Sequence, residues 1–214
     1  MSGDNIQGGR WPPKRCDMPD LSGFSSNLTV EYFANRTFRN VGLEIPFPGR
    51  AFFLNLTRLV DKTLYEYEEA RKYLQRYVHS RNETTLFFRC VGHMENSVDS
   101  LHRVFQHTNR LRHHLHTLEK ETHSGHPAPI IGRNELPKSK DRARVEKIRR
   151  AIQHMDDDIS KGKAGRNLAP IGLIVNSDSI ELGGMEISHE DLASWIKQVY
   201  KATQRLIEYE SLPE

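Results

Sequence analysis

Hydrophobic side chains recur at helical spacing along most of the chain. Between residues 50 and 80 they return every three or four positions, which predicts one long amphipathic helix. A second long pattern runs to about residue 120, and Asn82 is placed to cap its start. Shorter patterns cover residues 139–161 and 188–209. Together they predict a mainly α fold, a four-helix up-and-down bundle.

Two short apolar segments before the last helix do not follow the helical spacing. Residues 174–175 and 180–187 are separated by the polar turn Asn-Ser-Asp-Ser. A Gly-Gly turn interrupts the second of these segments. This arrangement predicts a small β-hairpin before the last helix. Ser188, followed three positions later by Asp191, is typical of a capped helix start.

Glycine and proline divide the rest of the chain. Residues 1–27 are rich in Gly, Pro and Ser, which predicts a mobile N-terminal arm. Residues 28–210 then form one helical-bundle domain. Inside it, residues 121–140 hold three prolines and two glycines, which predicts a long loop of the kind that often carries function.

The composition narrows the classes of function without choosing one. The 214 residues carry a formal net charge of +3, which permits a nucleic-acid partner but does not require one. No run of 18 apolar residues and no signal sequence is present, so we expect a cytoplasmic protein with no membrane partner. Cys16 and Cys90 show no Cys-x-x-Cys spacing, and Cys90 lies in an apolar pattern that predicts burial.

Two clusters raise the question of a metal site. Residues 102–126 are rich in histidine, but the His-x3-His spacing of zinc sites is absent, so a polar helix face is favoured. The run Asp156–Asp158 cannot direct all three carboxylates at one ion from a helix, so a solvated helix face is again favoured. We therefore expect neither a metal nor another cofactor.

Arginine and histidine come together on the third predicted helix. Arg150 and His154 lie opposite its apolar stripe, with Arg149 at the side. A guanidinium group can hold a phosphate, and an imidazole can transfer a proton near neutral pH. These groups suffice for metal-free cleavage of RNA by its own 2′-hydroxyl. The alternative is an ordinary polar helix face, because Arg110 and His116 have a similar spacing. The apolar stripe consists of Ile148, Ile152, Met155 and Ile159.

The same helix begins in the most basic part of the chain. Residues 133–150 contain eight Lys or Arg and three Asp or Glu, a net charge of +5. Such a segment can attract a polyanion, and Arg144, Lys147 and Arg150 are the candidates for substrate binding. A solvated helix start is the alternative explanation.

The stretch "IRRAIQHMDDDI" resembles a motif of the HEPN superfamily of small helical bundles. The family form Arg–Asn–Ala–Ile–Glu–His–Phe–Asp matches here at Arg149, Ala151, Ile152, His154 and Asp156. Arg150 departs from the form, since it replaces a small amide with a larger donor. The hairpin-like "IELGGMEIS" and the helix "HEDLASWIKQVYKA" also resemble the family.

The resemblance implies a metal-independent endoribonuclease. In that case Arg149 would contact the phosphate and His154 would act as acid and base, near the axis of a homodimer that builds one composite cleft. RNA is then the implied substrate, and an antitoxin or other protein partner in a defence or toxin-type system is a further implied partner. The resemblance also allows a non-catalytic RNA-binding or protein-interaction module. That alternative requires only the bundle, with the motif residues engaged in ion pairs.

Overall fold

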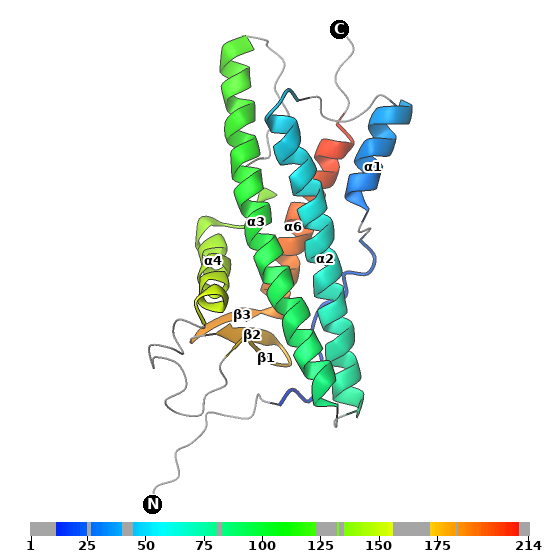
Figure 1. The fold of residues 1–214 in the computed structure, drawn as a ribbon, viewed down its shortest axis with the longest axis vertical. Coiled ribbons are helices and arrows are strands. Elements are labelled where there is room, and N and C mark those ends of the chain that lie inside the picture. The colour runs from blue at the N-terminus through cyan, green and yellow to red at the C-terminus, as the bar shows by residue number, and fades with distance from the viewer. Residues whose placement is uncertain are drawn as a thin grey trace, which may run out of the picture.

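The fold is mainly helical, with one small sheet (Figure 1). The computed structural model describes residues 12–24, 27–39, 45–80, 83–122, 132, 135–155, 172–182 and 184–209. The helices are α1 (Leu28–Ala34), the π-helix η1 (Asn35–Arg39), α2 (Gly49–Ser80), α3 (Thr84–Thr122), α4 (Ser139–Gln153) and α6 (His189–Ile207). The strands are β1 (Ile174–Val175), β2 (Ser179–Leu182) and β3 (Met185–Ser188).

The long pair α2 and α3 forms the body of the molecule, with α6 packed beside α2 (Figure 1). Both helices begin and end within about two residues of the positions that the apolar pattern predicts. Their inward faces are fully buried at positions such as Phe53, Leu64, Met94 and Leu101. Cys90 is buried there too, as predicted. Within the described residues, no helix has the length and apolar character needed to cross a membrane.

The predicted hairpin is present and has a third strand. The strands pair antiparallel in the order β1-β2-β3, with Ile180 opposite Ile187. Both isoleucines are fully buried, so one face of the sheet contributes to the core. Gly184 in the β2–β3 turn has a φ of 75°, a left-handed conformation that glycine adopts without strain. The predicted cap of α6 is confirmed, since the Asp191 amide donates to Ser188 Oγ at 3.0 Å.

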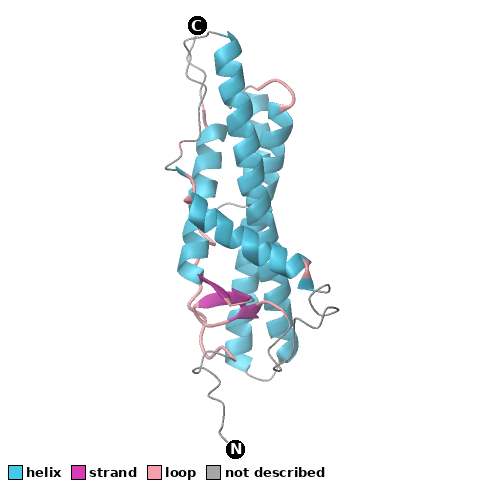
Figure 2. Ribbon diagram, turned by 90° about the vertical axis from the view of Figure 1, so that its left-hand side faces the viewer, coloured by secondary structure: helices cyan, strands magenta, loops and turns pink. Residues whose placement is uncertain are grey.

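The short helix α4 lies against α3 and above the sheet. Figure 2 looks directly at it and shows that it crosses the helices behind it obliquely. Val145 and Ile148 are fully buried, whereas Ile152 and Met155 of the expected stripe are only half-buried. The continuous helix expected to residue 161 is wrong at His154, which caps the C-terminal end of α4 with φ −100° and ψ 10°. Residues 156–160, including Ile159 and the three aspartates, lie outside the described residues.

Residues 12–24 pack along α2 and α6, which differs from the mobile arm expected for this part of the chain. The Leu21 amide donates to Glu68 Oε1 at 2.6 Å, and the Leu21 side chain is fully buried. Phe24 meets Tyr200 edge to face, with ring centroids 5.0 Å apart. These apolar side chains lack helical periodicity, yet they cover core surface that α2 and α6 leave open. The expected arm before this segment lies outside the described residues.

Candidate functional site

The exposed face of α4 is basic. Lys140, Lys147, Arg150 and His154 are all exposed, at intervals of seven, three and four residues. These intervals place them on one side of a helix with 3.6 residues per turn. Three of the five predicted site residues, Lys147, Arg150 and His154, are therefore brought together on this face. We call the four residues the α4 basic stripe.

Arg149, the predicted phosphate ligand, points toward α3 instead. Its Nε donates to Asp99 Oδ1 at 3.2 Å, and 23% of its side chain is exposed. The second oxygen of Asp99 accepts from Arg103 Nε at 2.9 Å. Positions five residues apart differ by about 140° around a helix, so Arg149 and His154 do not share a face. The structure thus separates the predicted catalytic pair.

Arg144 holds the opposite flank of α4 against the sheet and α6. One guanidinium nitrogen donates to Glu186 O at 2.7 Å, and another lies 3.3 Å from Asp191 Oδ2. The same group lies over the Trp195 ring, 5.5 Å from its centroid. A guanidinium group with this many acceptors positions α4, so Arg144 is less suited to substrate binding than predicted.

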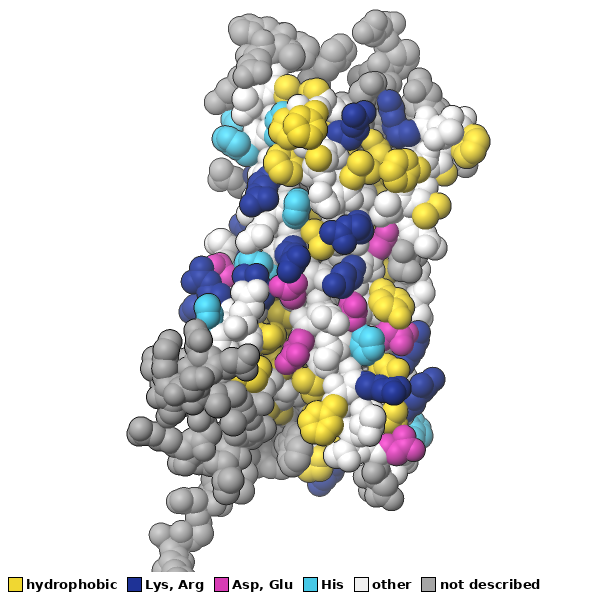
Figure 3. All heavy atoms as spheres, in the orientation of Figure 1, with side chains coloured by type: hydrophobic (Ala, Val, Ile, Leu, Met, Phe, Trp, Pro, Cys, Tyr) yellow, Lys and Arg dark blue, Asp and Glu magenta, His cyan; other side chains and the backbone are white. Residues whose placement is uncertain are grey.

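The two exposed candidates on the stripe differ in their partners. Arg150 forms an ion pair with Glu146 one turn earlier, and 66% of its side chain is exposed. Exposed pairs of this kind are weak, so the guanidinium can exchange Glu146 for another anion. Lys147 is exposed beside it. Figure 3 shows further Lys and Arg side chains over the middle of the α2–α3 face, where Asp and Glu side chains lie among them.

His102 on α3 was not among the predicted site residues, yet it belongs to the same polar surface as Arg149. Its side chain is buried, and the Gln106 amide lies 2.9 Å from its Nε2. Burial lowers the pKa of His102, and the positive charge of Arg149 lowers it further. Asp99, His102, Arg103 and Gln106 follow one another at intervals of three, one and three residues, which places them on one face of α3. This polar face could have been predicted from the sequence.

The other candidates for a metal site or a nucleophile are the histidine, acidic and cysteine side chains. Within the described part of the chain, no group of three or more His, Cys, Asp or Glu side chains is arranged to hold a metal ion. Asp156–Asp158, for which the sequence favours a solvated helix face, lie outside that part. Burial raises the pKa of the Cys90 thiol to about 12, which keeps it protonated and unreactive at neutral pH.

No family model, no curated protein and no solved structure matches the chain. The likeness to the HEPN superfamily therefore rests on the residues of the motif and on a mainly helical fold. It stays a prediction, and with it the activity that it implies.

Proposed function

We propose that this protein is a HEPN-like module that binds RNA through the α4 basic stripe. The observation that supports this most directly is the common exposure of Lys140, Lys147 and Arg150 on one helix face. From Lys140 to Arg150 the stripe extends about 15 Å, at about 1.5 Å of rise per residue. A cationic surface of that length contacts several phosphates, and release of their counterions favours binding.

Binding is favoured over cleavage because of Arg149. Its guanidinium group already has a carboxylate partner, Asp99, in a half-buried interface between two helices. A phosphate would have to displace that carboxylate, and among the described residues Asp99 would keep only Arg103 as an ion-pair partner. Displacing a charge-assisted hydrogen bond from a partly buried site carries a cost that an exposed arginine does not have.

A metal-independent endoribonuclease is the second candidate, and the position of His154 favours it. His154 is exposed at the end of α4, and Arg150 lies four residues before it on the same face. In this candidate the imidazole accepts the proton of the RNA 2′-hydroxyl, and the 2′-oxygen attacks the adjacent phosphorus. The P–O5′ bond then breaks as the imidazolium gives its proton to the 5′-oxygen, which leaves a 2′,3′-cyclic phosphate and a 5′-hydroxyl. Arg150 would offset the charge that develops on the phosphoryl oxygens.

Binding can be tested by fluorescence anisotropy with a labelled oligoribonucleotide over a series of salt concentrations. Lys147→Gln and Arg150→Gln should each weaken binding severalfold and lower the slope of log affinity against log salt by about one. Lys201→Gln is the matched control, because Lys201 is equally exposed but lies on α6. Equal effects of all three changes, or no binding by the wild-type protein, would contradict the proposal.

Cleavage is tested by incubating the same RNA with protein in EDTA. A binding module leaves the RNA intact. Cleavage that persists in EDTA, leaves cyclic phosphate ends and is lost in His154→Ala would establish the nuclease. Arg149→Ala would then decide whether Arg149 also takes part, since loss of a catalytic donor lowers the rate about a hundredfold or more. Cleavage that stops in EDTA would point to the aspartates after α4.

Self-association is part of the nuclease candidate. Arg150 and His154 supply few groups for catalysis, and a two-fold axis beside them would double the number. Sedimentation of the wild-type protein at micromolar concentration should then show a dimer. A strict monomer that nevertheless binds RNA would leave the binding module as the better account.

A further inference from the structure

A cavity of about 700 Å³ lies where α4 begins, beside α3. Four of its lining side chains are cationic: Arg112 from α3, and Lys138, Lys140 and Arg142 from the start of α4. Among the described residues that line it there is no carboxylate. Such a concentration of like charge around one hollow is unfavourable unless an anion compensates it.

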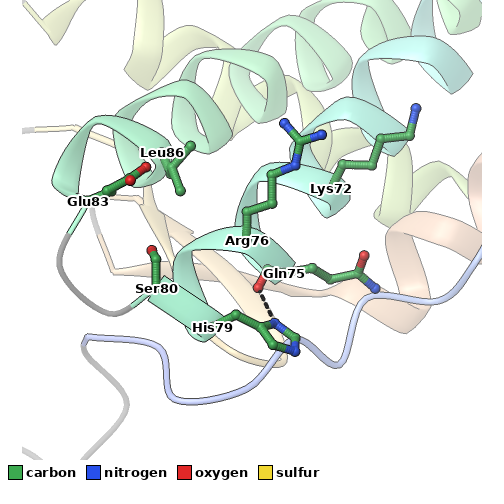
Figure 4. A pocket seen from close by; sticks show the side chains of 7 residues that line it. All are labelled: Lys72, Gln75, Arg76, His79, Ser80, Glu83 and Leu86. Carbon is green, nitrogen blue, oxygen red and sulfur yellow. Dashed lines mark hydrogen bonds between the residues drawn. The ribbon is translucent and has the colours of Figure 1, made fainter.

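A second cavity of about 730 Å³ shows that this charge pattern is not general. It lies at the turn between α2 and α3 and is lined by Lys72, Gln75, Arg76, His79, Ser80, Glu83 and Leu86 (Figure 4). Here Glu83 supplies a negative charge, and Lys72 Nζ is already 2.7 Å from Glu69 Oε1. The positive charge around this second cavity is therefore partly balanced by the protein itself.

Backbone donors add to the positive potential of the first cavity. Lys138 is the N-cap of α4, and its side chain makes no capping hydrogen bond. The amides of Asp141 and Arg142 both donate to Lys138 O, whereas those of Ser139 and Lys140 precede the first intrahelical bonds. Free amides at the positive end of a helix dipole are well suited to an anion.

The two arginines leave donors unused inside the cavity wall. Arg142 Nη1 donates to Asn109 Oδ1 at 3.0 Å, which fixes the guanidinium group beside α3. The Nε atoms of Arg112 and Arg142 are buried and have no hydrogen-bond partner among the described residues. A guanidinium group has five N–H donors, so the terminal nitrogens of both arginines keep donors that an anion in the cavity can use.

We propose that this cavity binds a phosphate monoester. A dianionic phosphate can accept from two guanidinium groups, two ammonium groups and the free amides at once. The buried side chains of Leu136 and Pro137 form an apolar wall, against which the organic part of the ligand would pack. The shared chemistry is the terminal phosphate, carried either by a small molecule or by the 5′ end of an RNA. This proposal does not depend on RNA binding by the α4 basic stripe.

The first test uses the ¹⁵N-labelled wild-type protein. Inorganic phosphate, adenosine 5′-monophosphate and adenosine are titrated separately while the backbone amide signals are recorded. The amides of Ser139 and Lys140 should shift with both phosphate-bearing compounds and stay in place with adenosine. If neither phosphate compound shifts them at millimolar concentration, the proposal is wrong. Because this test needs no variant, a folding defect cannot obscure its result.

The second test compares three substitutions by isothermal titration with adenosine 5′-monophosphate. Arg112→Gln and Arg142→Gln should each weaken binding about tenfold or more, because each removes a charge-assisted hydrogen bond. Arg110→Gln is the matched control: it removes the same charge from an exposed position two residues from Arg112. It should change affinity less than about twofold, because an exposed charge is screened. Equal weakening by all three would mean diffuse attraction without a site.

The source of the phosphate is then decided with two oligoribonucleotides of one sequence, one with a 5′-phosphate and one with a 5′-hydroxyl. Tighter binding of the phosphorylated strand, lost in Arg112→Gln, would identify an RNA end as the ligand. Equal binding of the two strands, together with binding of the mononucleotide, would identify a small phosphorylated molecule.

Discussion

The side of α3 that faces α2 and the side that faces α4 differ in the kind of residue that they carry. Toward α2 and the core, its residues are apolar and fully buried, as at Met94, Val98 and Leu101. Toward α4 it presents polar groups, and Asp99 and Asn109 each bind an arginine of that helix. The apolar side determines where the long helices lie. The polar side determines which cations of α4 are held inward and which remain exposed.

This difference divides three of the four arginines of α4 into two groups, while Arg144 is held by the sheet and α6. Arg142 and Arg149 lie on the flank that faces α3, where acceptors hold them in place. Arg150 lies on the outer face, where its partner Glu146 belongs to its own helix. Arg149 and Arg150 are adjacent in sequence, yet only Arg150 lies where a ligand can reach it readily. The following predictions test the comparison, beginning with the largest expected effect.

Truncating a side chain on the apolar side of α3 should lower the free energy of unfolding the most. Leu101→Ala should lower the free energy of unfolding by about 2–5 kcal/mol, because it leaves a cavity in a closely packed core. Leu101 has no exposed surface, whereas its neighbour His102 faces the polar side. Urea denaturation, monitored by circular dichroism, measures the free energy of unfolding of Leu101→Ala and of a second variant, His102→Gln. His102→Gln should cost clearly less than Leu101→Ala, and equal losses would mean that the two sides contribute alike.

Acidification should destabilise both sides of α3. Burial lowers the pKa of His102 on the α4 side and of His107 on the α2 side from the ordinary value of 6.5. Each histidine then binds a proton more readily in the unfolded chain. The stabilisation that the two neutral histidines give the fold is therefore fully present above about pH 6.5. It declines as the pH falls below that value. Thermal unfolding between pH 7.5 and 5 should show this decline, with a smaller slope in His102→Gln and in His107→Gln.

The held and the exposed arginine should differ in stability tests. Arg149→Gln should lower the free energy of unfolding by about 1 kcal/mol, because Asp99 loses one partner in a half-buried interface. Arg150→Gln should change it by less than about 0.5 kcal/mol, since its pair with Glu146 is exposed. Chemical denaturation of the two variants side by side provides the comparison. A larger loss from Arg150→Gln would reverse the assignment of inner and outer faces.

The smallest effect on stability is expected from Asn109→Ala. Asn109 is exposed and gives α4 one hydrogen bond, so its loss should cost about 0.5 kcal/mol. The same change should weaken phosphate binding at the cavity, because Arg142 is then no longer fixed beside it. Stability and phosphate titration are measured on one protein sample. Unchanged phosphate affinity would mean that Arg142 needs no positioning by α3.

The sequence predicted the elements whose signals are local. The apolar patterns gave α2 and α3 almost to the residue, and Ser188 with Asp191 gave the start of α6. The segment 12–24 was missed because its buried residues have no period, and their burial depends on contacts with α2 and α6, which are far away in the sequence. The break at His154 was missed because the apolar spacing continues past it.

The candidate site was predictable only in part. Helical geometry alone placed Arg150 and His154 on one face, and both are exposed there. The partner of Arg149 could not be predicted, since Asp99 is fifty residues earlier in the chain. His102 lies in a histidine-rich stretch whose spacing matches no zinc site, and no local pattern distinguishes it from its neighbours. Its relation to Arg149 depends on how two helices pack, which no local pattern records.

The sequence by itself determined the long helices α2 and α3, the capped start of α6, a hairpin before it and the face of α4 that would be polar. These features follow from hydrogen bonding and side-chain periodicity within a few turns of chain. Only the tertiary structure decided which of two adjacent arginines is held by Asp99 and which is exposed. It alone brought Arg112 to the start of α4 to form a cationic cavity. Both depend on charges far apart in sequence, whose interaction free energy is set by the distance and burial that packing imposes.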